Sequence, residues 1–312
     1  MKTLIITHRD LDGITSAMGF AINDLEKATP GKPTTFSSIF KNFTIVDFNY
    51  GEDIYKLLEN KKVNLSKFDR LVITDLTLSI KIMKDLHNQF KENLIWIDHH
   101  RLTYETTEAE LIKEDIKING IRDYSVAASI LVYRYFNKEP TELAKYVGDM
   151  DIWTWVIPNS RLFIAGLMSF ETNFRPDHFK FIHKLIENKR FEKEKNKIIK
   201  RGEIIIDYQK KLIKDECNIG KIVNFEGYKA FILNTFEAPG LVSDYIWSED
   251  KYKDIEIVIV WKRLHAIGID SVSLRSRTTS NVGVAEIARK HGGGGHLKAA
   301  SFKIADISNL NL

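Results

Sequence analysis

The tripeptide Asp98-His99-His100 directly follows the apolar run Leu94–Ile97, which predicts a buried strand. An aspartate followed by two imidazoles at the end of a strand suits metal ligation or proton transfer. A chain with nine histidines will sometimes place two side by side, so the tripeptide alone is weak support. Its weight comes from other segments of the first half that end in the same types of side chain.

The first of these segments places His8, Asp10 and Asp12 at alternate positions after an apolar run. In an extended or loop conformation this spacing points the three side chains the same way, and Gly13 then permits a tight turn into a helix. A polar loop with one helix-capping aspartate would explain one of these carboxylates but not the whole set. Two further carboxylates follow apolar runs at Asp75 and Asp149.

With Asp98 and His99, the first half therefore gathers five carboxylates and two imidazoles at similar places in the predicted fold. Burying so much negative charge is costly unless cations lie among the carboxylates. Oxygen ligands with a few imidazoles and no sulfur suit Mn²⁺ or Mg²⁺, and a bridged pair of such ions is the usual arrangement for phosphoryl or phosphodiester hydrolysis. The single cysteine, Cys217, excludes an internal disulfide and a cysteine-cluster zinc site.

Elements that could position these residues alternate along the first half. Strands are predicted at Lys2–Thr7, Ile45–Asn49, Asp69–Ile73 and Leu94–Ile97, and helices at Gly13–Asn23, about residues 50–59 and Ser79–Phe90. This alternation predicts an α/β fold with a mostly parallel sheet and helices on both faces. Ligands of such sheets bind beyond the carboxyl ends of the strands, where His8, Asp75 and Asp98 are expected.

The rest of the chain predicts a helical connection and a second domain. Helices are expected at Ser125–Phe136 and, as one or two long charged helices, within 179–216; the aromatic stretch 152–171 is interpreted as helical core in preference to a base-stacking platform. A helix at Val284–Lys290 and four strands, at 221–225, 229–233, 255–262 and 266–274, then indicate a smaller α/β domain. We expect a domain at 1–190, a helical linker at 191–218 and a C-terminal substrate-binding domain at 219–312.

A run of four glycines lies between His291 and His296. Its backbone is free to turn N–H groups toward an anion, to which His296 could also donate. Upstream, Ser273 and Arg275 share one face if their segment is extended, and Arg275 is a candidate for a bidentate phosphate contact. The glycines lack the Lys-Ser/Thr sequel of a P-loop.

Bulk composition excludes several classes of protein. The 312 residues are 44% hydrophobic and 28% charged, as in globular proteins, and no apolar window is long enough for a membrane span. The short apolar N-terminus does not resemble a signal peptide, so a cytoplasmic location without a membrane partner is expected. The net charge of +4 permits an anionic ligand but is not typical of a duplex-DNA binder.

Together these motifs resemble the DHH phosphoesterase superfamily, in the branch whose C-terminal domain carries a GGGH motif. The resemblance spans nearly the full length through His8-x-Asp10-x-Asp12-Gly13, Asp75, Asp98-His99-His100, Asp149 and Gly293-Gly294-Gly295-His296. It implies two α/β domains, an active site in the cleft between them and two Mn²⁺ ions, with Mg²⁺ as an alternative. The family usually has a glycine where this chain has Ser301.

The resemblance implies a role in metal binding, catalysis or substrate binding for each of these residues. One ion would be held by His8, Asp10 and Asp75, and the other by Asp12, Asp75, His99 and Asp149. Asp98 would orient a neighbouring histidine, and His100 would contact the scissile phosphate or donate a proton. Substrate would be bound by Ser273, Arg275, Gly293, Gly294, Gly295 and His296.

The compact layout most resembles the nanoRNases, which degrade short oligonucleotides to mononucleotides, so short RNA or DNA oligonucleotides are the expected substrates. Linear or cyclic dinucleotides and phosphoadenosine phosphate are alternative substrates, and a nucleotide-binding module without turnover is an alternative of another class. RecJ-like exonucleases carry additional domains, and the family's pyrophosphatases have a different C-terminal domain. A homodimer is possible through the long charged helix.

Overall fold

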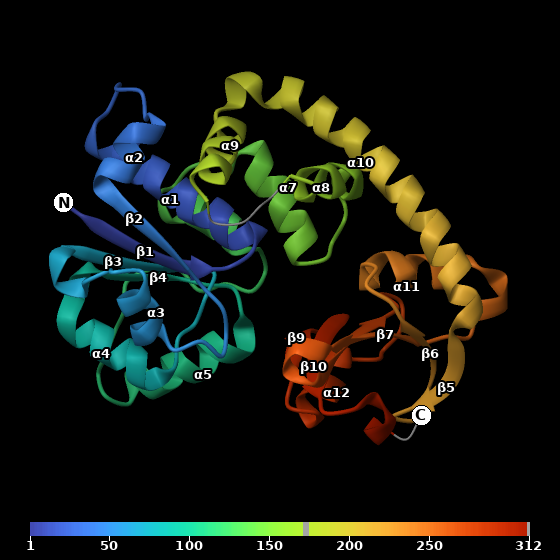
Figure 1. Cartoon of the computed structure of the whole chain (residues 1–312). Helices are drawn as coiled ribbons and strands as arrows, with labels where there is room; N and C mark the ends of the chain where they lie inside the picture. Colours follow the sequence, from blue (N-terminus) through green and yellow to red (C-terminus); the bar gives the residue numbers. More distant parts are fainter. Residues whose placement is uncertain (171–174, 311–312) are drawn as a thin grey trace. The chain divides into compact units, whose positions relative to one another are not determined.

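The computed structural model describes residues 1–170 and 175–310. The chain forms two compact units, Met1–Glu203 and Ile204–Leu312, each with its own sheet and its own apolar cores. Figure 1 shows the elements of both units. The predicted α/β class is confirmed.

The first unit is built on a four-stranded parallel sheet with the order β2-β1-β3-β4. Its strands are β1 (Thr3–His8), β2 (Phe43–Phe48), β3 (Arg70–Thr74) and β4 (Leu94–Ile97). They lie within a residue or two of the predicted ranges. Because all four run in parallel, their carboxyl ends meet at one edge of the sheet.

Both faces of this sheet are covered by helices, which explains why its strands are continuously apolar. Successive residues of β1 alternate between two cores: Ile5 belongs to one, and Leu4 and Ile6 belong to the other. The first core is shared with α1 (Leu11–Ala28), α6 (Ala128–Tyr135), α7 (Glu142–Asp151), α8 (Ser160–Met168) and α9 (Pro176–Ile186). The second is shared with α3 (Ile54–Asn60), α4 (Ile80–Phe90) and α5 (Arg101–Ile112); a short helix, α2 (Phe36–Asn42), precedes β2.

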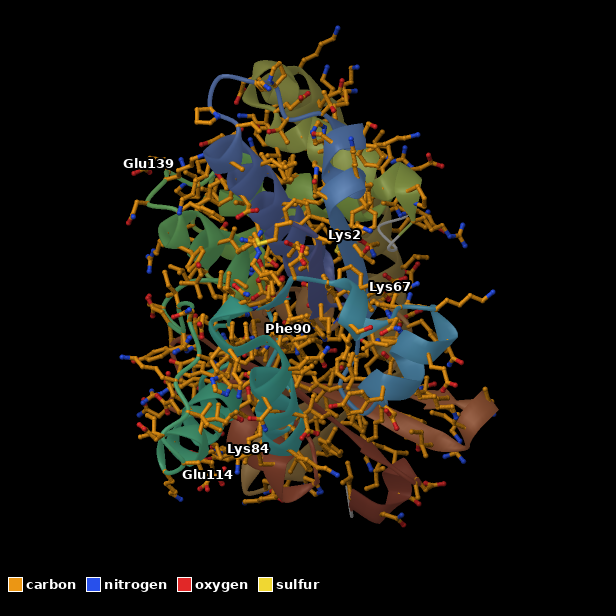
Figure 2. All side chains as sticks on the ribbon, turned by 90° about the vertical axis from the view of Figure 1, so that its left-hand side faces the viewer. Lys2, Lys67, Lys84, Phe90, Glu114 and Glu139 are labelled. Carbon is orange, nitrogen blue, oxygen red and sulfur yellow. The ribbon has the colours of Figure 1, made fainter. Side chains whose placement is uncertain are left out.

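Helix α4, which belongs to the layer formed with α3 and α5, has a charged outer side. Figure 2 labels Lys84 of α4 and Glu114, just after α5, which form an ion pair there. Phe90, the last residue of α4, is buried in the core. The charged and apolar sides of α4 thus follow the helical period expected from its sequence.

The structure corrects one expectation about the segment that follows α6. Asp149 lies in the last turn of helix α7. The aromatic stretch, expected to be helical, is helical only at Ser160–Met168, whereas Trp153 and Trp155 adopt left-handed conformations with φ of 60° and 52°. The final residue of the predicted stretch, Glu171, is outside the described residues.

The predicted linker 191–218 is largely one helix, α10 (Asn188–Glu216). Its crossing with α8 is unusually close. A Cβ atom added to Gly202 would lie 1.8 Å from the carbonyl oxygen of Leu162, and one added to Gly166 would lie 1.9 Å from that of Ile198. The two glycines therefore let the two backbones touch, which fixes this part of α10 against the first unit.

The second unit contains a six-stranded mixed sheet with the order β5-β6-β7-β8-β10-β9. Its strands are β5 (Lys221–Phe225), β6 (Tyr228–Asn234), β7 (Ile257–Leu264), β8 (Ile269–Ser276), β9 (Gly294–His296) and β10 (Ala299–Ile304). Helices α11 (Pro239–Ser248) and α12 (Val284–Lys290) complete the unit. The predicted strand at 266–274 begins three residues later than expected, after a left-handed Gly268.

No helix among the described residues has both the length and the apolar character needed to cross a membrane.

Candidate metal centre

The turn between β1 and α1 brings the first motif to the edge of the sheet. Asp10 caps α1 by accepting a hydrogen bond from the Gly13 backbone N–H at 2.8 Å, and its other carboxylate oxygen lies 2.6 Å from Nδ1 of His8. A Cβ atom at position 13 would lie 2.0 Å from the His8 carbonyl oxygen. Glycine is therefore required at position 13 by the close approach of the backbone.

Asp12 is fully buried at the first turn of α1. Its two carboxylate oxygens accept hydrogen bonds from the backbone N–H groups of Ala128 at 2.9 Å and Ser129 at 3.1 Å. Because these N–H groups belong to the start of α6, Asp12 is held by the positive end of a helix. This contact joins segments more than 100 residues apart.

Asp75 follows β3 and adopts a left-handed backbone conformation with φ of 57°. Its backbone N–H donates to the carbonyl of Ile97 at 2.9 Å, which fixes the residue between the ends of β3 and β4. Among the described residues, no hydrogen bond is made to either oxygen of its buried carboxylate. Its nearest polar neighbours are imidazole nitrogens of His8, His99 and His100, at 3.2–4.0 Å. Ionising a buried carboxylate without hydrogen bonds is costly, so a cation at this position would stabilise it.

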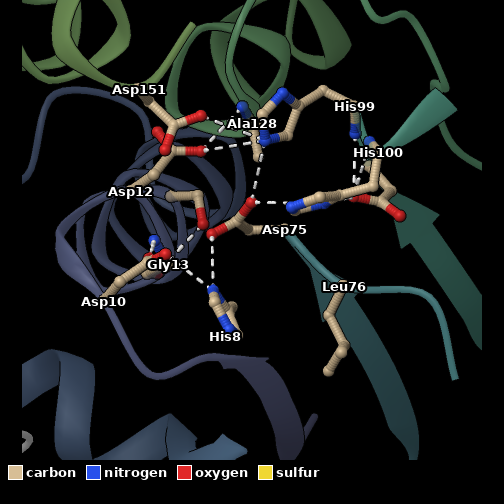
Figure 3. A network of polar contacts seen from close by, with 12 residues as sticks. His8, Asp10, Asp12, Gly13, Asp75, Leu76, His99, His100, Ala128 and Asp151 are labelled. Atoms are coloured by element: carbon tan, nitrogen blue, oxygen red, sulfur yellow. Dashed lines mark hydrogen bonds and ion pairs between the residues drawn. The ribbon is translucent and has the colours of Figure 1, made fainter. Parts of the chain in front are cut away.

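Asp98 and the two histidines follow β4 (Figure 3). Asp98 accepts hydrogen bonds from the His99 backbone N–H at 2.8 Å and from Nδ1 of His100 at 2.8 Å, and also from the Thr77 hydroxyl. Nε2 of His99 lies 3.2 Å from a carboxylate oxygen of Asp75. Asp98 therefore orients His100, as the family resemblance implies, while His99 points to the centre.

The end of α7 supplies a residue that sequence reasoning missed. Oδ2 of Asp151 lies 3.2 Å from Nε2 of His99, the same imidazole nitrogen that Asp75 approaches (Figure 3). The carboxylate of Asp149 turns elsewhere: it accepts hydrogen bonds from the Thr154 hydroxyl at 2.7 Å and the backbone N–H groups of Val156 at 2.8 Å and Ile157 at 3.1 Å. The structure thus brings Asp151, and not Asp149, to the other ligands.

The side chains form three groups whose candidate ligand atoms lie within 4.8 Å of one another. They are His8 with Asp10 and Asp75, Asp12 with His99 and Asp151, and Asp75 with His99 and His100. The first group has the composition expected for one ion. The second has the expected Asp12 and His99 but contains Asp151 where Asp149 was expected, and it lacks the expected Asp75, which belongs to the first and third groups. Carboxylate oxygens with a few imidazoles fit Mn²⁺ or Mg²⁺.

The electrostatics of the centre indicate a deficit of positive charge. Burial, and then the charges of Asp10, Asp12 and Asp151, raise the pKa of Asp75 well above its usual value. Burial and the charge of Asp10 raise the pKa of Asp12 to about 6, and burial with the charge of Asp12 strongly raises that of Asp151. A divalent cation would favour the ionised forms of these three carboxylates.

The pKa values of Asp10, Asp98 and His100 are shifted so that the charged form of each group is favoured. Burial opposes ionisation of Asp10 and Asp98, but the hydrogen bonds from His8 to Asp10 and from His100 to Asp98 lower both pKa values. Burial alone would lower the pKa of His100, but its hydrogen bond with Asp98 raises that pKa to about 9. His100 is therefore a protonated side chain at neutral pH, 27% exposed, in the absence of metal.

Four of the six predicted substrate residues, Ser273, Arg275, Gly294 and His296, lie on one face of the second unit's sheet. Arg275 of β8 pairs with Ala299 of β10, which pairs with His296 of β9, and Ser273, Ser301 and Gly294 form the next row. Directly paired residues of antiparallel strands lie on the same face. Burial lowers the pKa of Arg275 to about 10, and its Nη1 donates to the carbonyl of Leu274 at 2.9 Å.

Two of the three predicted glycines have a packing role. A Cβ atom at Gly293 would lie 2.1 Å from the Ser301 carbonyl oxygen, and one at Gly295, where φ is 138°, would lie 2.6 Å from that of Ala299. Gly294 has no neighbour within 4 Å of such an atom. The glycine run thus includes an edge strand closely packed on β10, and Gly294 lies on the same face as Arg275.

Comparisons with known proteins show the fold. No protein-family model matches the chain. A solved structure described as the pGpG-specific phosphodiesterase PggH from Vibrio cholerae is 17% identical, with a TM-score of 0.52 over 100% of this chain and 95% of that one. The DHH domain of a member of the S1p family of ribosomal proteins is 15% identical, with a TM-score of 0.51 over 96% of this chain and 82% of that one.

The architecture of two α/β units is therefore shared with these two structures, one of which is described as a DHH domain. An uncharacterized protein, R106, of Acanthamoeba polyphaga mimivirus is 25% identical over 274 residues, which are 83% of this chain. The match covers 57% of that relative's length.

Proposed function

We propose that this chain is a metal-dependent phosphodiesterase that hydrolyses short oligonucleotides to mononucleotides, with two Mn²⁺ ions as its cofactor. The observation that supports the proposal most is the carboxylate of Asp75, which is buried without a hydrogen bond from the described residues between two groups of candidate ligands. Such ions, when bound, activate water and neutralise the charge that develops on phosphoryl oxygens.

The chain's own residues would hold this centre and move a proton. His8, Asp10 and Asp75 would form one site, and Asp12, His99 and Asp151 the other, with Asp75 between them. Asp98 fixes the ring of His100 through Nδ1 at 2.8 Å. Because its pKa is raised to about 9, His100 would protonate the leaving oxygen or donate a hydrogen bond to the phosphate.

We further propose that the face of the second sheet defined by Ser273, Arg275, Gly294 and His296 binds the anionic end of the substrate. Arg275 supplies the planar donor set that suits phosphate, and Gly294 leaves the backbone accessible. Gly293 and Gly295 would contribute by holding the edge strand in place. Arg275→Ala is expected to raise KM more than it lowers kcat.

Hydrolysis of linear dinucleotides is a second candidate function, favoured by the fold shared with a protein described as a pGpG-specific phosphodiesterase. Incubation with Mn²⁺ and either a 5′-labelled RNA pentamer or a linear diguanylate separates the two candidates. Stepwise shortening of the pentamer supports the first, whereas cleavage of the dinucleotide alone supports the second. Phosphoadenosine phosphate tests the remaining expected substrate.

Asp75→Asn should abolish turnover of every substrate, and Asp85→Asn on the exposed side of α4 is the matched control that should retain it. If the wild-type protein binds Mn²⁺ and nucleotides but turns over none of them, the chain is a nucleotide-binding module and the enzymatic proposal is wrong.

A further inference from the structure

Exposure is distributed unevenly around the metal centre. The side chains of Asp12, Asp75 and His99 are at most 1% exposed, whereas those of His8, His100 and Asp10 are 22%, 27% and 39% exposed. Solvent, and therefore a substrate, reaches the centre from the side of His8 and His100. Any further residue on that side is placed to contact what binds there.

Tyr50 is such a residue, and no expected role in the centre includes it. Its ring centroid lies 5.6 Å from that of His8 and 6.1 Å from that of His100, and the two imidazoles are 6.2 Å apart. The three rings therefore form a compact triangle at the open side of the centre. Although Tyr50 packs against both imidazoles, 47% of its surface is exposed.

The turn that carries Tyr50 is tightly held. Glu52 N–H donates to the Asn49 carbonyl at 3.1 Å, and Gly51 between them has a φ of 90°, as glycine does at the third position of a type II turn. The Glu52 carboxylate in turn accepts from the Asn49 backbone N–H at 2.9 Å. The tyrosine is thus presented by an ordered turn.

Arg9 ties this turn to the first metal-binding motif. It lies between His8 and Asp10 in sequence, and its guanidinium forms ion pairs with Asp47 and, at 3.0 Å, with Glu52. Its backbone N–H also donates to the Phe48 carbonyl at 3.0 Å. Arg9 therefore fixes the turn that carries Tyr50.

The hydroxyl of Tyr50 is also positioned. It accepts a hydrogen bond from the backbone N–H of Thr77 at 3.3 Å, and the Thr77 hydroxyl donates to Asp98. Both ends of the side chain are therefore anchored to segments of the centre. An exposed aromatic ring anchored in this way loses little conformational entropy when a ligand packs on it.

We propose that Tyr50 is a stacking platform for the nucleobase of the nucleotide whose phosphate binds at the metal centre; this inference rests on the proposed function. The base of a nucleotide lies one sugar away from its phosphate, and the Tyr50 ring lies beside the two imidazoles that border the centre. Stacking on an aromatic side chain accepts every base, so Tyr50 would confer preference for nucleotides without selecting among them.

The test compares two ligands that differ only in the base. Affinities of adenosine 5′-monophosphate and ribose 5-phosphate are measured by calorimetry on the Mn²⁺-loaded full chain. The wild-type protein should prefer the nucleotide, and Tyr50→Ala should weaken its binding by roughly 5- to 150-fold without changing that of ribose 5-phosphate. Tyr50→Phe retains the ring and should keep most of the preference.

Tyr55→Ala is the matched control, because Tyr55 lies on α3, is 43% exposed and bonds to Asp85 away from the centre. An unchanged preference in Tyr50→Ala, or an equal loss in Tyr50→Phe, would overturn the inference. Equal wild-type affinity for the two ligands would also overturn it while leaving the proposed function standing. Mn²⁺ binding without binding of either ligand would instead count against the proposed function itself.

Discussion

At the scale of single residues, neighbours in the Asp98-His99-His100 tripeptide have three different tasks. Asp98 accepts hydrogen bonds from backbone and side chains, His99 lies within 3.2 Å of two carboxylates, and His100 lies at the open side. The two imidazole rings lie 4.4 Å apart, but they differ in exposure, since the His99 side chain is 1% exposed and that of His100 is 27% exposed.

Asp149 and Asp151 provide a matched pair of variants. Asp151→Asn should weaken Mn²⁺ binding at least about tenfold, because it removes an anionic ligand, and should leave folding intact. Asp149→Asn should leave Mn²⁺ affinity nearly unchanged but lower the free energy of unfolding by about 1–3 kcal/mol, because the carboxylate accepts three hydrogen bonds in the following loop. Calorimetric titration and urea unfolding measure both effects. A larger loss of Mn²⁺ affinity in Asp149→Asn would restore the original assignment.

Metal affinity should depend on pH in a direction set by Asp12. Its pKa in the metal-free fold is raised to about 6 by burial and the charge of Asp10, so a proton must leave when a cation binds. Affinity for Mn²⁺ should therefore fall at least about tenfold for each pH unit below 6. It should keep rising with pH above 6, because Asp75 and Asp151, whose pKa values are also raised, must lose protons as well. Titrations in buffers of different ionisation enthalpy would detect the released proton. Affinity that does not change between pH 5 and 7 would contradict the raised pKa.

The raised pKa of Asp12 also makes the stability of the metal-free protein depend on pH. A carboxyl whose pKa is higher in the folded state favours folding at low pH, and this contribution is lost as pH rises from the unfolded value of 3.8 through about 6. The metal-free protein therefore loses this contribution at neutral pH, and the cation offsets the loss.

Residue types and spacing were sufficient to predict most of this site, but not the choice between Asp149 and Asp151. Residues two positions apart on an α-helix, such as Asp149 and Asp151, point about 200° apart, so only one of them can face the centre. Tertiary packing determines which one: Leu143, Tyr146 and Val147 turn their side of α7 into the core. Both aspartates are present in the sequence Gly148-Asp149-Met150-Asp151, but the sequence alone does not define which of them the helix turns toward the centre.

At the scale of elements, the sheet was predictable because each of its strands is buried on both faces and reads as a short apolar run. The order β2-β1-β3-β4 was not, because it depends on pairing between segments distant in sequence. The strand within the four-glycine run was not predicted either. Composition indicated a backbone free to approach an anion, but it did not reveal that Gly294–His296 pairs with β10.

The crossing of α8 and α10 gives a test at this scale. Replacing glycine by alanine within an exposed helix normally stabilises it by up to about 1 kcal/mol. At Gly202 we expect the opposite sign, a loss of about 1–3 kcal/mol, because the new methyl group would meet the Leu162 carbonyl at 1.8 Å. Urea unfolding of Gly202→Ala measures the change, with Ile204→Ala, at a position 74% exposed, as the control. A stabilised Gly202→Ala protein would refute the close crossing.

At the scale of the whole molecule, two units with separate cores were expected from the change in sequence character near residue 220. The unit boundary at residues 203 and 204 falls within α10 and inside the predicted linker at 191–218. Helical periodicity identifies a long helix but not which core each turn contacts. Ile198 packs in a core of the first unit and Ile213 in one of the second, which only the structure distinguishes.

The most direct test of this account is the location of metal ions in crystals of the protein grown with Mn²⁺, measured by anomalous diffraction. We predict two peaks per chain, one among His8, Asp10 and Asp75 and the other among Asp12, His99 and Asp151. Crystals of Asp75→Asn should lose at least one of them. A single peak in the wild-type protein, a peak bound by Asp149, or no peak at this edge of the sheet would contradict the two-ion centre.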